Sequence, residues 1–434
     1  MFQLICEPSG FALSSASILG DMASSFRTVV FTACRTGALR SRGTYTVCTY
    51  IPKAAGFHTR RQFSSQQRSR PSRRYQAPAP QTPTKSFHTT RRSQSSSKFT
   101  YGIAASFSAK DHRYNPDTNV FNFNLYNRIL ARRKDKRTRP SSGQDAFFIS
   151  RIDSTSDVAF GIADGVGGWA DSGVDPADFA HGFCDYMAHA AYTYKKGNWE
   201  GGMGARALMQ RGYEDICRDD SVLAGGSTAC VGIARGDGGL EVANLGDSGF
   251  VQLRLNAIHT ASEPQIHAFN TPYQLSIVPE KVLAQAAAFG GEQLRDLPKD
   301  ANVSQHELRH GDVLVFASDG VWDNLSSQEI LKIVSRIMLG ARAWEHTEDG
   351  VSAGKRLGQF ILADDGKSGA EEIPSLQSFL AVGITSEAKA ASVNTKKDGP
   401  FAREVQKYYP YENWRGGKVD DICVVVAVVC EERK

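Results

Sequence analysis

The sequence predicts an α+β domain in which a mixed sheet sandwich is covered by helices. Short apolar runs rich in Val, Phe and Ile are bounded by Gly and Asp, which is typical of strands. Helical patterns separate some of these runs, but no strict strand–helix alternation indicates a doubly wound parallel sheet. With 434 residues, 41% of them hydrophobic, the chain can bury a sizeable core.

The apolar runs predict strands at 146–149, 158–162, 229–233, 240–244, 250–255, 313–317 and 423–429. Helical periodicity predicts helices at 176–194, 204–217, 279–289 and 328–338. The last helix is preceded by Ser326 and Glu329 at the spacing of a capping box. Residues 339–415 show little pattern apart from a short helix near 354–362, so we expect an insertion or a long loop there.

Charge is divided unevenly along the chain. Residues 1–110 hold 16 Lys and Arg against two acidic residues, a net charge of +14, whereas the other 324 residues hold 35 against 44, a net charge of −9. A nucleic-acid-binding domain would carry its basic excess on the folded part, but here the folded part is acidic. The charge distribution therefore excludes a folded nucleic-acid-binding domain. No apolar run reaches the ~18–20 residues of a membrane-spanning helix, and we expect no integral membrane segment. The eight cysteines form no Cys-x-x-Cys pair, which argues against a zinc site or a disulfide framework.

The N-terminal tail predicts mitochondrial import. Between Met22 and Lys110 there is no Asp or Glu, while Arg and Ser are abundant, a composition typical of transit peptides. The segment Arg61-Gln62-Phe63-Ser64 resembles the cleavage signal of mitochondrial presequences. We therefore expect a transit peptide at 1–63, an unstructured Ser-, Pro- and Arg-rich linker at 64–98 and a folded domain at 99–434. The alternative is a basic arm that is retained and binds nucleic acid or a membrane surface.

Four aspartates lie where predicted strands meet turns. They are Asp145, Asp164, Asp319 and Asp420. Carboxylates gathered on rigid strand ends repel one another unless a cation lies among them. Oxygen ligands without His or Cys point to Mg²⁺ or Mn²⁺, and Gly165 allows a backbone carbonyl to approach as a further ligand. One such Asp-Gly alone would be only a turn. Asp247 is a fifth case, which we expect to form a hairpin turn.

Six segments in order carry a family resemblance. They are Gly-Gln-Asp at 143–145, Ala-Asp-Gly-Val-Gly-Gly at 163–168, Gly-Gly-Ser-Thr-Ala at 225–229, Asn-Leu-Gly-Asp-Ser-Gly at 244–249, Ala-Ser-Asp-Gly-Val-Trp-Asp at 317–323 and Asp-Asp-Ile-Cys-Val-Val-Val at 420–426. Together they resemble the metal-dependent type 2C serine/threonine protein phosphatases, the PPM family, over roughly residues 100–430. Residues 267–276 resemble the mitochondrial branch of that family.

The resemblance implies a four-layer α-β-β-α sandwich of two mainly antiparallel sheets flanked by helix pairs. It also implies a centre of two Mg²⁺ or Mn²⁺ ions at one sheet edge. Asp164 would bridge both ions and the Gly165 carbonyl would complete one of them, while Asp319 and Asp420 would hold the other.

The same resemblance implies roles for two further residues. Asp145 would not bind an ion directly but would form a hydrogen bond with the water that the ions hold. Asp323 matches a position that in some relatives binds a further, weaker metal.

Three positions depart from the family pattern. A His is usual two residues after the bridging aspartate, but this chain has Val166, and a Glu is usual where it has Gln144. The Arg that binds phosphate is not cleanly aligned. Arg139 is our candidate, with Lys136 and Arg137 as neighbouring alternatives.

The implied reaction is hydrolysis of phosphoserine and phosphothreonine in protein substrates by direct attack of metal-activated water. No Cys-x5-Arg loop is present, which argues against a thiol-phosphate intermediate. The resemblance to the mitochondrial branch further implies a role in regulating metabolic enzymes, with ubiquinone biosynthesis as the first pathway to consider. We expect the protein to be a monomer and, from its tail, to lie in the mitochondrial matrix. The alternative is a catalytically inactive phosphatase fold that serves as a binding or regulatory module. Tyr408, Tyr409, Tyr411 and Trp414 form either a docking surface or ordinary loop packing.

Overall fold

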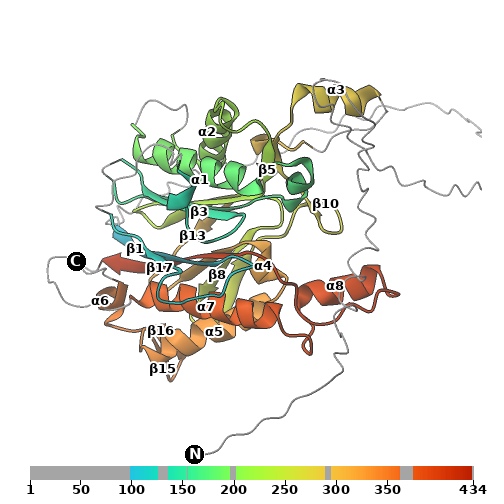
Figure 1. Ribbon diagram of the computed structural model, residues 1–434. Helices are drawn as coiled ribbons and strands as arrows, with labels where there is room; N and C mark the ends of the chain where they lie inside the picture. The colour runs from blue at the N-terminus through green and yellow to red at the C-terminus, as the bar shows by residue number, and fades with distance from the viewer. Residues whose placement is uncertain are drawn as a thin grey trace, which may run out of the picture. The chain divides into compact units, whose positions relative to one another are not determined.

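The computed structural model describes residues 98–125, 135–153, 155–195, 202–288, 295–361 and 375–432 (Figure 1). The predicted transit peptide lies outside these residues, as does the predicted linker except for residue 98. Residues 64–280 and 293–434 belong to one compact unit, which holds all the elements below except most of α3 (Glu280–Ala288).

Two antiparallel sheets form the centre of this unit. The first has the order β13 (Asn302–Glu307), β7 (Gly239–Leu245), β6 (Ala229–Ala234), β4 (Val158–Asp164) and β3 (Asp145–Arg151). The second has the order β2 (Val120–Asn122), β1 (Lys98–Ser108), β17 (Ile422–Glu432), β14 (Val313–Ala317), β8 (Gly249–Arg254) and β9 (Ala257–Ala261). Both faces of β17 are covered, so its residues 422–430 are buried on both sides of the sheet, as their Val-rich run requires.

Helices cover the outer faces of both sheets (Figure 1). Helices α1 (Pro176–Tyr192) and α2 (Ala205–Cys217) pack on the first sheet, and α5 (Ser327–Gly340) and α7 (Leu376–Ser392) pack on the second. The shorter elements are β5 (Gly225–Ser227), β10 (Ile266–Ala268), β11 (Thr271–Pro272), β12 (Leu275–Ile277), α4 (Asp319–Trp322), β15 (Trp344–Thr347), β16 (Gly350–Ala353), α6 (Leu357–Ile361) and α8 (Pro400–Tyr408). Three 3₁₀ turns lie at Lys136–Thr138, Gly167–Ser172 and Pro298–Asp300. The predicted sandwich of two mainly antiparallel sheets is confirmed.

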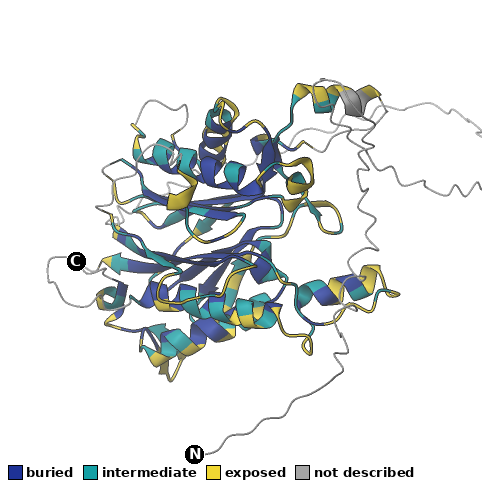
Figure 2. Ribbon diagram, viewed as in Figure 1, coloured by how far each residue is buried: buried dark blue, intermediate teal, exposed yellow. Residues whose placement is uncertain are grey.

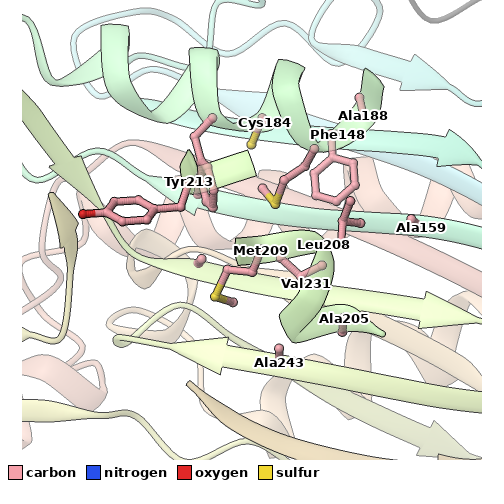
Figure 3. Packing of buried hydrophobic residues seen from close by; sticks show 14 of the residues in the cluster. Phe148, Ala159, Cys184, Ala188, Ala205, Leu208, Met209, Tyr213, Val231 and Ala243 are labelled. Carbon is pink, nitrogen blue, oxygen red and sulfur yellow. The ribbon is translucent and has the colours of Figure 1, made fainter. Parts of the chain in front are cut away.

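Three apolar clusters hold these layers together, and Figure 2 shows that the exposed residues gather on loops and on the outer sides of the helices. Between the sheets, the ring of Phe316 lies 4.9 Å from Phe160 and 5.4 Å from Phe250, measured between centroids. Helices α1 and α2 close the cluster of Figure 3, where Leu208 and Met209 face the first sheet. Each packed face excludes water from one side of a sheet, which is the main stabilising contribution to such a sandwich.

The local signals for the helices behave as the sequence predicts. Asp175 caps α1 by accepting a hydrogen bond from the backbone N–H of Ala177 at 3.2 Å. The capping box of α5 is confirmed, since Ser326 and Glu329 accept hydrogen bonds from each other's backbone N–H. The predicted strands are confirmed as β3, β4, β6, β7, β8, β14 and β17, and the predicted helices as α1, α2, α3 and α5.

The prediction of an insertion or long loop at 339–415 is wrong for much of that range. Helix α7 takes up 17 of these residues and covers the second sheet, with Leu380 and Ile384 fully buried. Its periodicity is hard to see because Gln377, Ser378 and Thr385 are buried on the helix as well. Two of these polar side chains find hydrogen-bond acceptors, Gln377 on the carbonyl of Ile361 and Ser378 on a carbonyl of its own first turn. The short helix predicted near 354–362 is present as α6.

None of the helices in the described part of the chain is long and apolar enough to cross a membrane.

Candidate metal centre

The four predicted aspartates converge where the two sheets meet at one edge. Asp145 at the start of β3 lies directly opposite Asp164 at the end of β4 in the antiparallel ladder. In the second sheet, Asp319 follows β14 and Asp420 precedes β17, and these two strands pair with each other. Directly opposed side chains on adjacent strands lie roughly 4.5–5.5 Å apart, so like charges there are unfavourable unless they are compensated.

Ser318 joins the two sheets at this edge. Its hydroxyl donates a hydrogen bond of 2.7 Å to Oδ2 of Asp145 and accepts one of 3.0 Å from the backbone N–H of Cys423. The other carboxylate oxygen of Asp145, Oδ1, is buried and has no hydrogen-bond partner among the described residues. A buried acceptor without a donor is costly, so this oxygen is available to a donor that enters the site.

Crowding of carboxylates governs the electrostatics of the centre. Burial, together with the charges of Asp319 and Asp145, raises the pKa of Asp164 well above its usual range. Burial and the nearby Asp421 likewise raise the pKa of Asp145. Such shifts mean that the ionised carboxylates lack a compensating charge, which divalent cations would supply.

Asp247 belongs to this cluster, and the expectation of a hairpin turn is wrong. The strands on either side of it, β7 and β8, lie in different sheets, so the Gly246–Ser248 connection crosses from one sheet to the other. Burial and the charge of Asp319 raise the pKa of Asp247 to about 7. The signal was present in the sequence, since Asp247 lies in one of the six family segments, but a Gly-Asp-Ser-Gly run also reads as a turn.

Lys418 also belongs to the site, and the sequence did not indicate it. Its Nζ lies 2.7 Å from Oδ2 of Asp319, 2.6 Å from Oδ2 of Asp323 and 3.1 Å from Oδ2 of Asp420. Burial disfavours the charged form of the Asp319 carboxylate, but the positive charge of Lys418 and the hydrogen bonds of the carboxylate together have the larger effect. The pKa of Asp319 is therefore lowered. Within the described residues, no three His, Cys, Asp or Glu side chains have the spacing of metal ligands in this conformation.

The family segments hold the aspartates in place through Thr228. Its hydroxyl accepts a hydrogen bond of 3.2 Å from the Asp164 N–H, and its own N–H donates one of 2.9 Å to the Asp164 carbonyl. The same hydroxyl lies 2.7 Å from the hydroxyl of Ser248, beside Asp247. Thus the Gly-Gly-Ser-Thr-Ala segment positions two acidic segments.

Gly165 is required by the closeness of neighbouring backbone. A Cβ atom there would lie 2.8 Å from the carbonyl oxygen of Gln144 and 2.9 Å from that of Pro176. Both distances are shorter than Cβ contacts allow, so only glycine lets these three segments meet. The predicted role of the Gly165 carbonyl as a metal ligand stays a prediction.

Asp420 and Asp421 have different roles. The carboxylate of Asp421 accepts hydrogen bonds from the backbone N–H of Lys110 at 2.6 Å and of Gln144 at 2.8 Å. It therefore fixes the loop that leads into β3. Asp420 instead directs its carboxylate to Lys418.

Of the three basic candidates, which all line the same pocket, Arg139 is the most buried, with a side chain that is 12% exposed. It lines a pocket of about 530 Å³ together with Gly143, Gln144 and His181. One of its terminal nitrogens donates to Oδ1 of Asp178 at 2.7 Å, while its Nε is buried without a partner among the described residues. Its role as a phosphate ligand stays a prediction.

The two alternatives to Arg139 are more exposed, and Arg139 and Lys136 share the same two carboxylate partners. Lys136 is held by two carboxylates, those of Asp175 at 3.0 Å and Asp178 at 2.8 Å. Arg137 pairs with Asp135 and is 88% exposed, so it lies in solvent.

An aromatic groove of about 490 Å³ continues from the acidic cluster. Asp247, Asp319 and Asp323 line one part of it, and Phe269, Phe401 and Tyr408 are among the residues that line the rest. The Phe269 ring lies 5.5 Å from the rings of Phe401, Tyr408 and Tyr409, measured between centroids. These rings pack on one another and also border the centre.

The chemistry of the donor atoms in the centre fits divalent cations, although in this conformation the described side chains do not have the spacing of metal ligands. The donor set consists of oxygen atoms only, which Mg²⁺ and Mn²⁺ prefer. The unpartnered Oδ1 of Asp145 indicates that a hydrogen-bond donor would bind at this edge of the sheets. The raised pKa of Asp164 indicates that a positive charge would bind there as well.

Comparison with known proteins decides the family. No protein-family model matches the chain. It is 31% identical over 290 residues to the protein phosphatase PTC7 homolog of Xenopus laevis, which covers 67% of this chain and 82% of that protein. The chain belongs to the type 2C protein phosphatases, in the PTC7 group. The predicted family and the predicted enzyme class, a protein-serine/threonine phosphatase, are therefore confirmed.

Two further proteins resemble this phosphatase. It is 29% identical over 335 residues to a Saccharomyces cerevisiae protein named protein phosphatase 2C homolog 7, mitochondrial, which covers 77% of this chain and 84% of the yeast protein. Among solved structures, that of the photosystem II phosphatase PBCP matches with a TM-score of 0.47 and 24% identity, over 66% of this chain and 91% of that one.

Proposed function

We propose that this phosphatase hydrolyses phosphoserine and phosphothreonine in proteins through a centre of two Mg²⁺ or Mn²⁺ ions. The observation that supports it most directly is the set of carboxylates from both sheets at one edge, with Asp145 Oδ1 buried and free. Asp164, the Gly165 carbonyl, Asp319 and Asp420 would hold the ions. Family membership supports the reaction class, and the oxygen-only donor set supports these metals.

The chain's own residues then have defined tasks. Divalent ions held by these residues would supply a water of lowered pKa and positive charge that offsets the charge of the phosphoryl oxygens. Asp145 accepts a hydrogen bond from the attacking water on Oδ1, and Ser318 fixes its orientation by occupying Oδ2. The attack forms a new P–O bond and breaks the ester bond. The leaving serine or threonine oxygen gains a proton, which Val166 does not supply because it has no titratable group.

Activity of the full chain on p-nitrophenyl phosphate and on phosphopeptides tests this proposal. Hydrolysis should require Mn²⁺ or Mg²⁺, stop with EDTA, and fall at least ~10²-fold in Asp164→Asn and Asp319→Asn. Equal rates in EDTA would contradict the two-metal reaction. A folded chain that is inactive with every metal would instead favour the regulatory-module alternative, for which Val166 and Gln144 are the reasons.

We further propose that the phosphatase acts in the mitochondrial matrix on metabolic enzymes, with those of ubiquinone biosynthesis as the first candidates. The acid-free tail and the segment Arg61-Gln62-Phe63-Ser64 support import, and so does the name of the yeast relative. N-terminal sequencing of the mature protein from mitochondria should find Ser64 as the first residue. A mature chain that keeps residues 1–63 would favour the retained basic arm.

A further inference from the structure

A lysine ammonium group lies among the acidic side chains of the metal centre. Lys418 Nζ is within 2.7 Å of Asp319 Oδ2 and 2.6 Å of Asp323 Oδ2, and the lysine side chain is only 16% exposed. Asp319 is a proposed ligand of the two-ion centre, and Asp323 lies at the position where the family resemblance implies a further ion. The space between these two carboxylates is therefore the place where a third cation would be held.

We propose that Lys418 is a built-in cation at this place, so that the phosphatase binds two metal ions and has no third site. The inference rests on the proposed two-metal function. It goes beyond that function because it assigns the third position to a side chain of the protein itself.

The backbone of Lys418 is locked to the turn that carries both carboxylates. Its N–H donates a hydrogen bond of 2.9 Å to Oδ1 of Asn324, and Nδ2 of Asn324 donates one of 2.8 Å to the Lys418 carbonyl. The same Nδ2 also donates to the Gly320 carbonyl at 2.8 Å. Because the buried Asn324 side chain bonds to both segments, it holds the Lys418 backbone against the Asp319–Asp323 turn. The backbone from which the lysine side chain extends is thus fixed to this turn.

The side chain is also held from the other direction. Nζ lies 5.0 Å from the ring centroid of Phe401, a distance at which a cation is attracted to an aromatic face. The contact with Asp420 is longer, at 3.1 Å, so the shortest contacts are those to Asp319 and Asp323. A tethered ammonium neutralises one charge without depending on metal concentration, and it occupies the oxygens that a third ion would need.

The test counts Mn²⁺ ions bound per chain by equilibrium dialysis with metal analysis, using the full-length protein. The wild type should bind two ions at saturation, and Lys418→Met should bind three because the lysine no longer occupies Asp319 and Asp323. Lys418→Arg, which keeps the positive charge, is the matched control and should bind two. Circular dichroism checks that each variant is folded.

A second variant keeps the proposal testable if Lys418→Met fails to fold. Asp323→Asn in the otherwise wild-type chain should still bind two ions, because Asp323 holds the lysine and no metal. Three ions in the wild type, two in Lys418→Met, or loss of one ion in Asp323→Asn would each overturn the proposal. Failure of the folded wild type to bind any Mn²⁺ would instead overturn the two-metal centre.

Discussion

The free carboxylate oxygen of Asp145 makes a prediction about catalysis. Asp145→Asn removes the charge that would orient the attacking water but leaves the size of the side chain unchanged. We expect kcat to fall about 10²-fold with KM changed by less than about twofold, since general-base groups contribute roughly 10²–10⁴. Steady-state kinetics on p-nitrophenyl phosphate measure this, with Asp135→Asn as the control because the Asp135 carboxylate pairs with Arg137 on the surface. An unchanged kcat would remove Asp145 from the reaction.

His181 makes a prediction about stability and pH. Burial, with the charge of Arg139, lowers the pKa of His181 to about 4, from an unfolded value of about 6.5. Between these values the unfolded chain binds the proton and the folded chain does not, so stability falls as the pH falls from about 6.5 to 4. The full loss is about 3 kcal/mol.

The measurement compares urea unfolding of the wild type and His181→Gln from pH 7 to pH 4. The variant should lose less stability than the wild type over this window by about that amount. Parallel pH profiles would show that His181 titrates normally in the folded protein.

At the residue scale, the sequence indicated the acidic residues but could not rank all of them. Asp145, Asp164, Asp319 and Asp420 stand out because each adjoins a clear apolar strand. The role of Lys418 depends on its closeness to a turn nearly a hundred positions away, and a Gly-Gly-Lys loop by itself is typical of a solvated surface. Local sequence cannot reveal such a long-range contact.

At the element scale, the approach of α4 to β17 depends on Gly320. A Cβ atom at this residue would collide with the Asp421 carbonyl oxygen and would lie 3.2 Å from Cγ1 of Ile422. Gly320→Ala should therefore push Asp319 away from Asp420, lowering Mn²⁺ affinity at least ~10-fold and stability by about 1–3 kcal/mol.

Isothermal titration with Mn²⁺ and chemical unfolding measure the two effects of Gly320→Ala. The control is Gly340→Ala at the end of α5, where a Cβ atom would meet nothing within 4 Å. That variant should bind Mn²⁺ normally and lose no stability, because alanine favours helix. Equal behaviour of the two variants would show that the close approach of α4 does not position the site.

The elements that the sequence missed share a physical cause. Strand β13 lies at a sheet edge and alternates exposed with half-buried polar residues, so it has no apolar run. Strand β1 is rich in Ala and Ser because α7 packs closely on it, and Gly102 leaves no room for a Cβ beside Ile361. In both cases the neighbours decide the structure more than the strand's own propensity.

At the scale of the whole molecule, periodicity predicted layers of strands and helices, but it did not predict how the strands divide between two sheets. The family resemblance implied that there are two sheets. The way in which the strands divide between them brings the aspartates together. β7 and β8 are consecutive in the chain yet belong to opposite sheets. Strand pairing of this kind depends on contacts far apart in sequence, which short apolar runs do not encode.

Because the centre takes carboxylates from both sheets, metal binding should stabilise the whole domain. Asp164 comes from the first sheet and Asp420 from the second, so ions between them would link the two. Binding to the folded state alone contributes about 2.7 kcal/mol at 100 times the dissociation constant, a rise of several degrees in Tm. Differential scanning calorimetry should show this rise with Mn²⁺ and its reversal with EDTA.

The variants decide whether the stabilisation comes from the centre. Asp164→Asn and Asp420→Asn, one from each sheet, should each reduce the rise in Tm, because each variant removes one of the carboxylates that would hold the ions. Asp349→Asn, in the exposed turn between β15 and β16, should keep the full rise. A full rise that survives in both centre variants would place the stabilising Mn²⁺ elsewhere on the surface.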